Sequence, residues 1–284
     1  MKRRRAHFIP WRSAGNVTET DINSDQVVRE TGWVFNNKTG NSLTLESFVK
    51  TGDAEARRYL RQFGFTPDLL ATRTLLEIGC GIGRMTSAFT SQCGRVIAAD
   101  VDASFLERCR ETVSTHGRVD RLQTSHVSDG RTLVLPDNSV DLAFSYITLQ
   151  HCDRDDALKL TREAIRVTRG GGSIMLNYRL QIPSDALLIP LGVFVRMIWR
   201  IPVIGQKMSL WRWATRLGWQ ANRLRPDDVL EYLRIDPEVL TSLSEIRVFH
   251  SPRRSLKTNI TSVDSQALKR VNLSHWWLVA KINK

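Results

Sequence analysis

The residues best suited to chemistry lie in a short glycine-rich segment, Leu75 to Arg84 (LLEIGCGIGR). An apolar run leads to Glu77, and glycines follow at the alternate positions 79, 81 and 83. In an open α/β sheet, such a loop brings bare backbone against a ligand at the carboxyl end of a strand. The segment therefore predicts a ligand-binding loop directly after a buried strand.

The details of this loop restrict the kind of ligand. A phosphate-binding loop ends in Gly-Lys-Ser/Thr, which is absent here, and the dinucleotide fingerprint needs a glycine where Arg84 stands. A carboxylate so close to the loop is a poor neighbour for a pyrophosphate and a good one for a cation. We therefore expect a positively charged ligand in contact with Glu77, Gly79 and Gly81.

Two further acids follow apolar runs. Residues 95–100 (RVIAAD) read as a buried strand ending in Asp100, whose carboxylate can accept hydrogen bonds from both hydroxyls of a ribose. Val101 could cover one face of a purine, and Asp129 with Gly130 is suited to accept from an exocyclic amine. These positions predict a nucleoside with a cationic tail, and S-adenosylmethionine fits that description.

Four motifs in this order resemble those of the class I S-adenosylmethionine-dependent methyltransferases, in the broad bacterial group with small-molecule or glycan acceptors. They are the glycine loop, Asp100, residues 135–141 (LPDNSVD) and residues 163–172 (EAIRVTRGGG), where Gly170 replaces a proline. The resemblance implies a Rossmann-like α/β fold, with a seven-stranded, mostly parallel sheet closed by an antiparallel hairpin. It also implies S-adenosylmethionine as cofactor and Tyr146 beside it. A Rossmann-like domain that has lost its ligand is the alternative.

His151 is the candidate catalytic residue. Residues 146–151 (YITLQH) follow the predicted fourth strand, where the resemblance implies the floor of a methyl-transfer site. An alcohol acceptor must lose a proton during transfer, and the ordinary pKa of imidazole suits a general base near neutrality. A purely structural histidine is the alternative. No His/Asp cluster has metal-ligand spacing, so we expect no metal.

Alternating apolar strands and helical patterns from Thr74 to Tyr178 predict a parallel sheet. A helix is expected at 52–63 before the first strand, with Ala56, Tyr59, Leu60 and Phe63 on one face. Another is expected around Ala157, Leu160, Ala164 and Val167. The last strand of the run is expected at 173–178, and two closing strands at 245–249 and 276–280.

The 284 residues divide into a basic, partly disordered leader and cap (1–50), a cofactor-binding core (51–178), a helical insertion (179–230) and closing strands (231–284). The net charge of +12 belongs to residues 1–12 and 180–284, because residues 13–179 sum to −1. Four widely spaced cysteines indicate a reducing compartment, and Cys80 is expected to fill a small space rather than act as a nucleophile. No apolar run follows the basic start, so we expect a cytoplasmic protein without a signal peptide.

The insertion is the second informative feature. Residues 186–225 contain seven Lys/Arg, no acid and four of the eight tryptophans. Residues 186–205 nearly reach bilayer-spanning length, but Arg196 and Arg200 interrupt them, and Pro190 and Pro202 are expected to break the helix. We favour a helical lid over the acceptor. The alternative is a surface that contacts anionic membrane or a lipid-linked acceptor.

Three classes of function fit these observations. The leading one is O-methylation of a sugar, glycolipid or small hydroxylated metabolite by in-line transfer. The basic ends suggest an RNA or protein methyltransferase as an alternative, and the third is a non-catalytic, membrane-associated cofactor-binding protein. The absence of RNP-like aromatic and KH patterns argues against a nucleic-acid partner.

Overall fold

The computed structural model describes residues 25, 28, 44–199, 201, 203–209, 211–219, 222–250, 262–264 and 274–284. Apart from residues 25, 28 and 44–50, the predicted leader and cap lie outside this range. The chain forms two compact units. The first consists of Met1–Phe48 with Ile182–Gln220, and the second of Val49–Gln181 with Ala221–Lys284.

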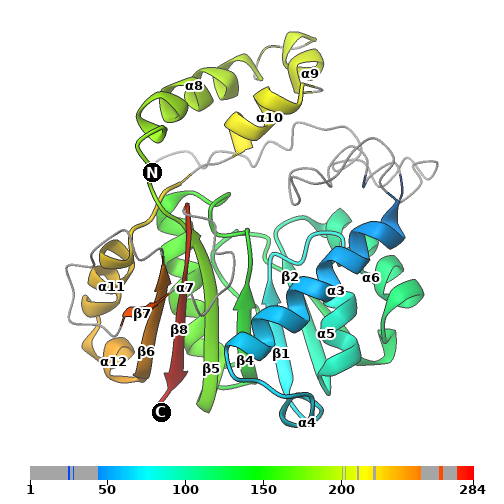
Figure 1. The fold of residues 1–284 in the computed structure, drawn as a ribbon, viewed down its shortest axis with the longest axis vertical. Coiled ribbons are helices and arrows are strands. Elements are labelled where there is room, and N and C mark those ends of the chain that lie inside the picture. Colours follow the sequence, from blue (N-terminus) through cyan, green and yellow to red (C-terminus); the bar gives the residue numbers. More distant parts are fainter. Residues whose placement is uncertain are drawn as a thin grey trace. The chain divides into compact units, whose positions relative to one another are not determined.

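In the described part of the chain, the second unit is built on one sheet with the strand order β3-β2-β1-β4-β5-β8-β6-β7 (Figure 1). Its parallel strands are β1 (Thr74–Ile78), β2 (Arg95–Asp100), β3 (Leu122–His126), β4 (Val140–Ser145) and β5 (Thr168–Arg179). Strand β8 (His275–Ile282) runs antiparallel between β5 and β6 (Leu243–His250). The predicted Rossmann-like sheet with its closing hairpin is confirmed, and β7 (Ser262–Asp264) adds a short strand beside β6.

Successive residues of the central strands face opposite sides of the sheet, and each side carries its own core. On one side, Leu75 and Leu142 pack with α3 (Leu45–Gln62) and α5 (Thr86–Gln92). On the other side, Leu76 and Ala143 pack with α7 (Arg154–Val167) and α11 (Pro226–Arg234). The remaining helices of this unit are α4 (Pro67–Leu70), α6 (Ala103–His116), the 3-10 turn Val119–Arg121 and α12 (Pro237–Thr241).

Two predicted boundaries needed correction. Helix α3 begins at Leu45, seven residues before the predicted start, although the predicted apolar face of Ala56, Tyr59, Leu60 and Phe63 is buried as expected. Strand β5 begins at Thr168, five residues before the predicted start. Thr168 ends α7 in an extended conformation, so the chain passes from helix to strand without a loop.

The first unit contains α8 (Asp185–Ile198), α9 (Ile204–Ser209) and α10 (Arg212–Trp219). They share a small core of Val195, Trp199, Met208 and Ala214. The expectation that Pro190 breaks the helix was wrong, because α8 continues through it. Pro190 lies in the second turn, where it removes a single backbone hydrogen bond. Pro202 lies outside the described residues. Within the described range, no helix has both the length and the apolarity to cross a bilayer.

Asp141 offers a test of how the sheet is held together. Its buried carboxylate accepts hydrogen bonds from Arg73 Nη1 at 2.7 Å and Thr74 N at 2.8 Å, and it pairs with Arg169. We expect Asp141→Ala to reduce the free energy of unfolding by about 2–3 kcal/mol. This value is below that of a fully buried pair, since both arginines reach solvent. Urea denaturation measures the loss, and Asp155→Ala on exposed helix surface serves as the control.

Candidate functional site

The glycine loop between β1 and α5 has two different sides. Gly79 has φ of +78°, and a Cβ there would lie 2.0 Å from Thr148 Cγ2 in the loop after β4. Gly81 has φ of +53°, and nothing lies within 4 Å of the place where its Cβ would stand. Gly79 therefore packs tightly against the neighbouring strand end, whereas Gly81 leaves open space beside the backbone.

Asp100 ties the end of β2 to this loop. Its Oδ2 accepts a hydrogen bond from Gly81 N at 2.9 Å, and its Oδ1 accepts one from Asp102 N at 3.0 Å. Burial raises the pKa of Asp100 to about 6, with the backbone donors acting in the opposite direction. A carboxylate has about four acceptor positions, so Asp100 can accept further hydrogen bonds while holding the loop.

Glu77 lies buried at the end of β1. Its Oε2 accepts a hydrogen bond from Thr86 Oγ1 at 2.7 Å. Burial raises the pKa of Glu77 to about 8, although Thr86 and the positive charge of Arg84 oppose the shift. Keeping this carboxyl in the protein interior is therefore costly once it is ionised, and a nearby cation would stabilise the ionised form.

An ion pair that the sequence did not reveal closes α3 onto the glycine loop. The guanidinium of Arg84 is buried and lies 2.7 Å from Glu55 Oε2 on α3. Gly52, one turn earlier, lets the helix approach, because a Cβ there would lie 2.0 Å from Arg84 O. The signal in the sequence is Arg84 itself, at the position where a dinucleotide loop has its third glycine.

The loop after β4 forms an aromatic wall. Tyr146 stacks on Trp277 of β8, with ring centroids 5.5 Å apart and planes at 5°, and it also contacts Tyr59 of α3 at 4.9 Å. Burial raises the pKa of the Tyr146 phenol well above its usual value, so the hydroxyl keeps its proton. Ile147 follows with φ of +58°, a strained conformation for a β-branched residue, and its N–H donates to Asn177 Oδ1 at 3.3 Å.

His151 is half-buried at the end of this loop and adjoins a polar chain. Its Nε2 lies 3.3 Å from Gln150 Nε2, and Gln150 Oε1 lies 3.1 Å from His275 Nε2. Burial lowers the pKa of His275 to about 4, so this imidazole is neutral and its Nε2–H donates to the Gln150 oxygen. In this arrangement the Gln150 amide nitrogen points toward His151. No motif indicated that His275 would take part.

The remaining predicted cofactor residues lie at the neighbouring strand ends. Val101 follows β2 and is partly exposed, and Val127 N donates to Asp100 O at 2.9 Å, which brings the loop after β3 alongside. Asp129 Oδ1 accepts from Arg131 N at 2.8 Å and Thr132 N at 2.7 Å, so its carboxylate orders its own turn. Gly130 continues that turn with φ of +67°.

The structure brings four predicted residues together at the ends of β1 and β2: Glu77, Gly79, Gly81 and Asp100. Gly130 joins them through Val127, which donates to Asp100 O and accepts from Gly130 N. Cys80 is buried in a small cluster with Cys109, and burial raises the pKa of its thiol well above the usual value, as expected for a residue that fills space. Among the described residues, no group of three or more His, Cys, Asp or Glu side chains is placed to hold a metal ion.

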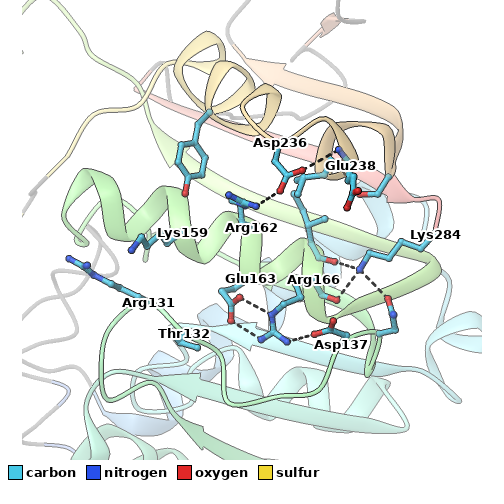
Figure 2. A pocket seen from close by; sticks show the side chains of 15 residues that line it. Arg131, Thr132, Asp137, Lys159, Arg162, Glu163, Arg166, Asp236, Glu238 and Lys284 are labelled. Carbon is cyan, nitrogen blue, oxygen red and sulfur yellow. Dashed lines mark hydrogen bonds and ion pairs between the residues drawn. The ribbon is translucent and has the colours of Figure 1, made fainter.

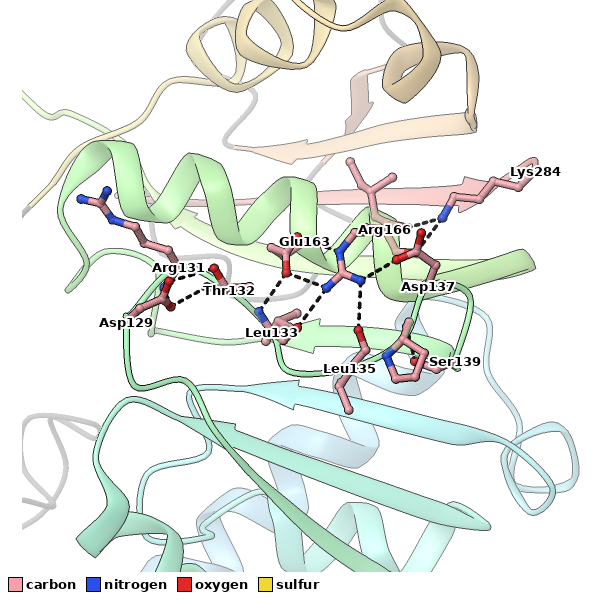
Figure 3. A network of polar contacts seen from close by, with 12 residues as sticks. Asp129, Arg131, Thr132, Leu133, Leu135, Asp137, Ser139, Glu163, Arg166 and Lys284 are labelled. Carbon is pink, nitrogen blue, oxygen red and sulfur yellow. Dashed lines mark hydrogen bonds and ion pairs between the residues drawn. The ribbon is translucent and has the colours of Figure 1, made fainter.

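A separate cavity of about 570 Å³ lies along α7 (Figure 2). Its charges are largely paired with one another. Arg162 pairs with Asp236 (Figure 2), and Arg166 pairs with Glu163 and Asp137 (Figure 3). Lys284 Nζ donates to the carbonyl oxygens of Ile165 and Arg166 at 2.8 Å, which satisfies the end of α7. These contacts give the cavity a structural role, and we assign the candidate site to the strand ends.

The candidate site lies in a part of the chain that matches known proteins. Residues 76–176 match the family model described as a methyltransferase domain. This stretch is therefore a methyltransferase domain, and the four motifs that resemble the class I S-adenosylmethionine-dependent enzymes lie within it or at its edge. The matched range begins inside β1 and ends inside β5, so it includes the glycine loop, Asp100 and the loop after β4.

Relatives of this methyltransferase domain carry names with different acceptors. The chain is 29% identical over 163 residues to phosphoethanolamine N-methyltransferase 1 of Triticum aestivum, covering 54% of this chain and 30% of that protein. It is 32% identical over 113 residues to the malonyl-[acyl-carrier protein] O-methyltransferase of Yersinia pestis, covering 40% and 39%. The chain spans less than a third of the length of the plant relative.

The fold also matches solved structures. Magnesium protoporphyrin IX methyltransferase (ChlM) from Synechocystis PCC 6803, solved with bound SAH, superposes with a TM-score of 0.53. The two chains are 12% identical, and the match covers 95% of this chain and all of that one. At this identity, the likeness shows the fold of the methyltransferase domain alone.

Glu77 makes a testable contribution to stability. Because its folded pKa of about 8 lies above the unfolded value of 4.5, Glu77 lowers the free energy of unfolding as the pH rises between these values. We expect Glu77→Gln, which removes the charge, to raise the melting temperature of the ligand-free protein by a few degrees at pH 8 and hardly at pH 5. Glu111→Gln on the exposed face of α6 is the matched control. Equal shifts at both pH values would contradict the assignment.

Proposed function

We propose that this protein is an S-adenosylmethionine-dependent methyltransferase that methylates a hydroxyl group of a sugar, a glycolipid or another small metabolite. The observation that carries the proposal is the link between the open side of Gly81 and the carboxylate of Asp100, 2.9 Å from Gly81 N. Backbone free of side chains and an acceptor for ribose hydroxyls thus stand together at the ends of β1 and β2. The methyltransferase domain supports the same assignment.

The residues at the strand ends suit this cofactor chemically. Asp100 would accept from the ribose hydroxyls, and Val101 would cover one face of the adenine. Asp129 and Gly130 would lie at its amine edge, and Gly79 with Gly81 would admit the close approach of the tail. Glu77 is buried with one hydroxyl donor, and a cation nearby would offset the cost of its ionised form. When bound, S-adenosylmethionine supplies a methyl group already activated by its sulfonium.

The loop after β4 supports an acceptor on the same side. Tyr146 keeps its proton and is fixed by its stack on Trp277, so it would position the reactants rather than remove a proton. We assign the general base to His151. Its Nε2 faces the Gln150 amide, and that weak contact at 3.3 Å must give way for Nε2 to accept the acceptor's proton. The proposal that oxygen is the methylated atom rests on this base.

The relatives' names leave other acceptors to be tested. They include N- and O-methyltransferases of small molecules and of an acyl-carrier protein. No observation on the described residues favours RNA. A hydroxylated small molecule remains our proposal because an amine or carboxylate acceptor has less need of a positioned base.

Asp100 provides the first test of the proposal. We expect Asp100→Asn to weaken binding of S-adenosylhomocysteine about 10- to 100-fold in calorimetry, because charge-assisted hydrogen bonds to the ribose are lost. Binding to the unchanged protein should also weaken as the pH falls below about 6, where Asp100 takes up a proton. Asp120→Asn on the exposed 3-10 turn is the control. No binding by the unchanged protein would overturn the proposal.

His151 provides the second test. A panel of sugars and glycolipids, screened with labelled S-adenosylmethionine, would supply an acceptor. With that acceptor, we expect His151→Ala to lower kcat about 10²- to 10⁴-fold while leaving the cofactor dissociation constant unchanged. The partly exposed His116→Ala serves as the matched control. Parallel losses in kcat and in cofactor affinity would instead show that His151 is structural.

A further inference from the structure

The helices α8, α9 and α10 expose many large apolar side chains. Among the described residues, eleven such side chains between positions 187 and 213 are 37–74% exposed. They are Leu187, Ile189, Leu191, Val193, Phe194, Met197, Ile201, Val203, Ile204, Trp211 and Trp213. Isolated exposed apolar residues are normal on a protein surface, but a concentration in one short segment marks an interaction site.

Helix α8 is apolar around nearly its whole circumference. It contacts α10 through a narrow strip, where Gly192 approaches so closely that a Cβ would lie 2.6 Å from Leu217 O. Asp185 is buried and accepts a hydrogen bond from Ile182 N at 2.9 Å, while Arg196 donates to Gly218 O at 3.2 Å. A helix without a polar face is expected in a core or in lipid. At 14 residues, α8 spans only about 21 Å, which is too short to cross a bilayer.

The charge of the segment indicates what covers it. Residues 182–220 contain five Lys/Arg and a single acid, the buried Asp185. Lys207 is exposed, and no carboxylate of this segment is accessible to repel an anion. Trp211 and Trp213 are about half exposed, with ring centroids 5.9 Å apart. Tryptophan pairs of this kind, beside lysine and arginine, are typical of the boundary between lipid headgroups and acyl chains.

We propose that α8, α9 and α10 dock on an anionic phospholipid surface. The apolar side chains enter the acyl boundary, and the basic residues stay among the headgroups. Lipid fits better than a protein partner because the exposed side chains surround α8 rather than lie on one face, and because the cations need only diffuse negative charge. This inference goes beyond the proposed function, since residues 182–220 lie outside the methyltransferase domain.

Flotation of the full chain with vesicles tests the inference directly. We expect binding to vesicles of three parts phosphatidylcholine and one part phosphatidylglycerol. With phosphatidylcholine alone, binding should be weaker by a factor of about ten or more. Leu187→Glu with Phe194→Glu should abolish binding. Val134→Glu with Ile235→Glu is the matched control, because those side chains in the other unit are comparably exposed at 72% and 74% and should tolerate the change.

A second pair of variants tests the contribution of charge to vesicle binding. Lys207→Glu should weaken binding to the anionic vesicles, whereas Lys159→Glu, an exposed lysine on α7, should not. Binding of S-adenosylhomocysteine by each variant shows that the fold is intact, and it separates this inference from the proposed function. Vesicles with brominated acyl chains provide a readout on the unchanged protein, since tryptophans at the acyl boundary are quenched.

Several results would overturn the inference. These are absence of quenching, equal binding to neutral and anionic vesicles, or full binding by the Leu187→Glu, Phe194→Glu variant. The unchanged protein could instead form a dimer and not bind vesicles. If the Leu187→Glu, Phe194→Glu variant then converted this dimer to a monomer, a second copy of the chain would be shown to cover the apolar side chains of α8.

Discussion

The hydrogen bond from Gly81 to Asp100 is the constraint on which the candidate site depends. It connects the loop after β1 to the end of β2, so the bare backbone and the acid hold a fixed relation. The loop cannot move away without leaving a buried carboxylate short of a donor, which is costly in the protein interior. The contact of Gly79 with Thr148 fixes the same loop against the end of β4. Three parallel strands thereby present their ends as one surface.

Helix α3 depends on that surface in turn. The buried guanidinium of Arg84 needs Glu55, and Gly52 is the residue that lets the helix backbone approach. Tyr59 on the same helix reaches Tyr146 and Trp277. The wall of the site is thus assembled from a helix before the sheet, the loop after β4 and the strand β8, three segments far apart in the sequence.

The sequence predicted the elements whose signals are local. The run 95–100 is β2 with the predicted bounds, and the ordered motifs indicated the sheet topology. Contacts between distant segments could not be predicted in this way. Arg84 gave no hint of Glu55, and Gln150 gave none of His275, 125 residues away. The Pro190 prediction failed because a local rule for helix breaking ignores tertiary packing, and α8 packs against α10 through Gly192 and Val195.

Strand β8 has a practical consequence for anyone who wishes to recombine this protein with its relatives. It separates β5 from β6 and carries Trp277, which supports Tyr146. The range shared with the family model stops inside β5 and does not include it. A chimera that carries only that range, without β8, would leave the long edge of β5 exposed to solvent, and an unpaired strand edge promotes aggregation. To exchange function between such proteins, the closing strands β6 and β8 must be transferred together with the part of the chain that carries the motifs.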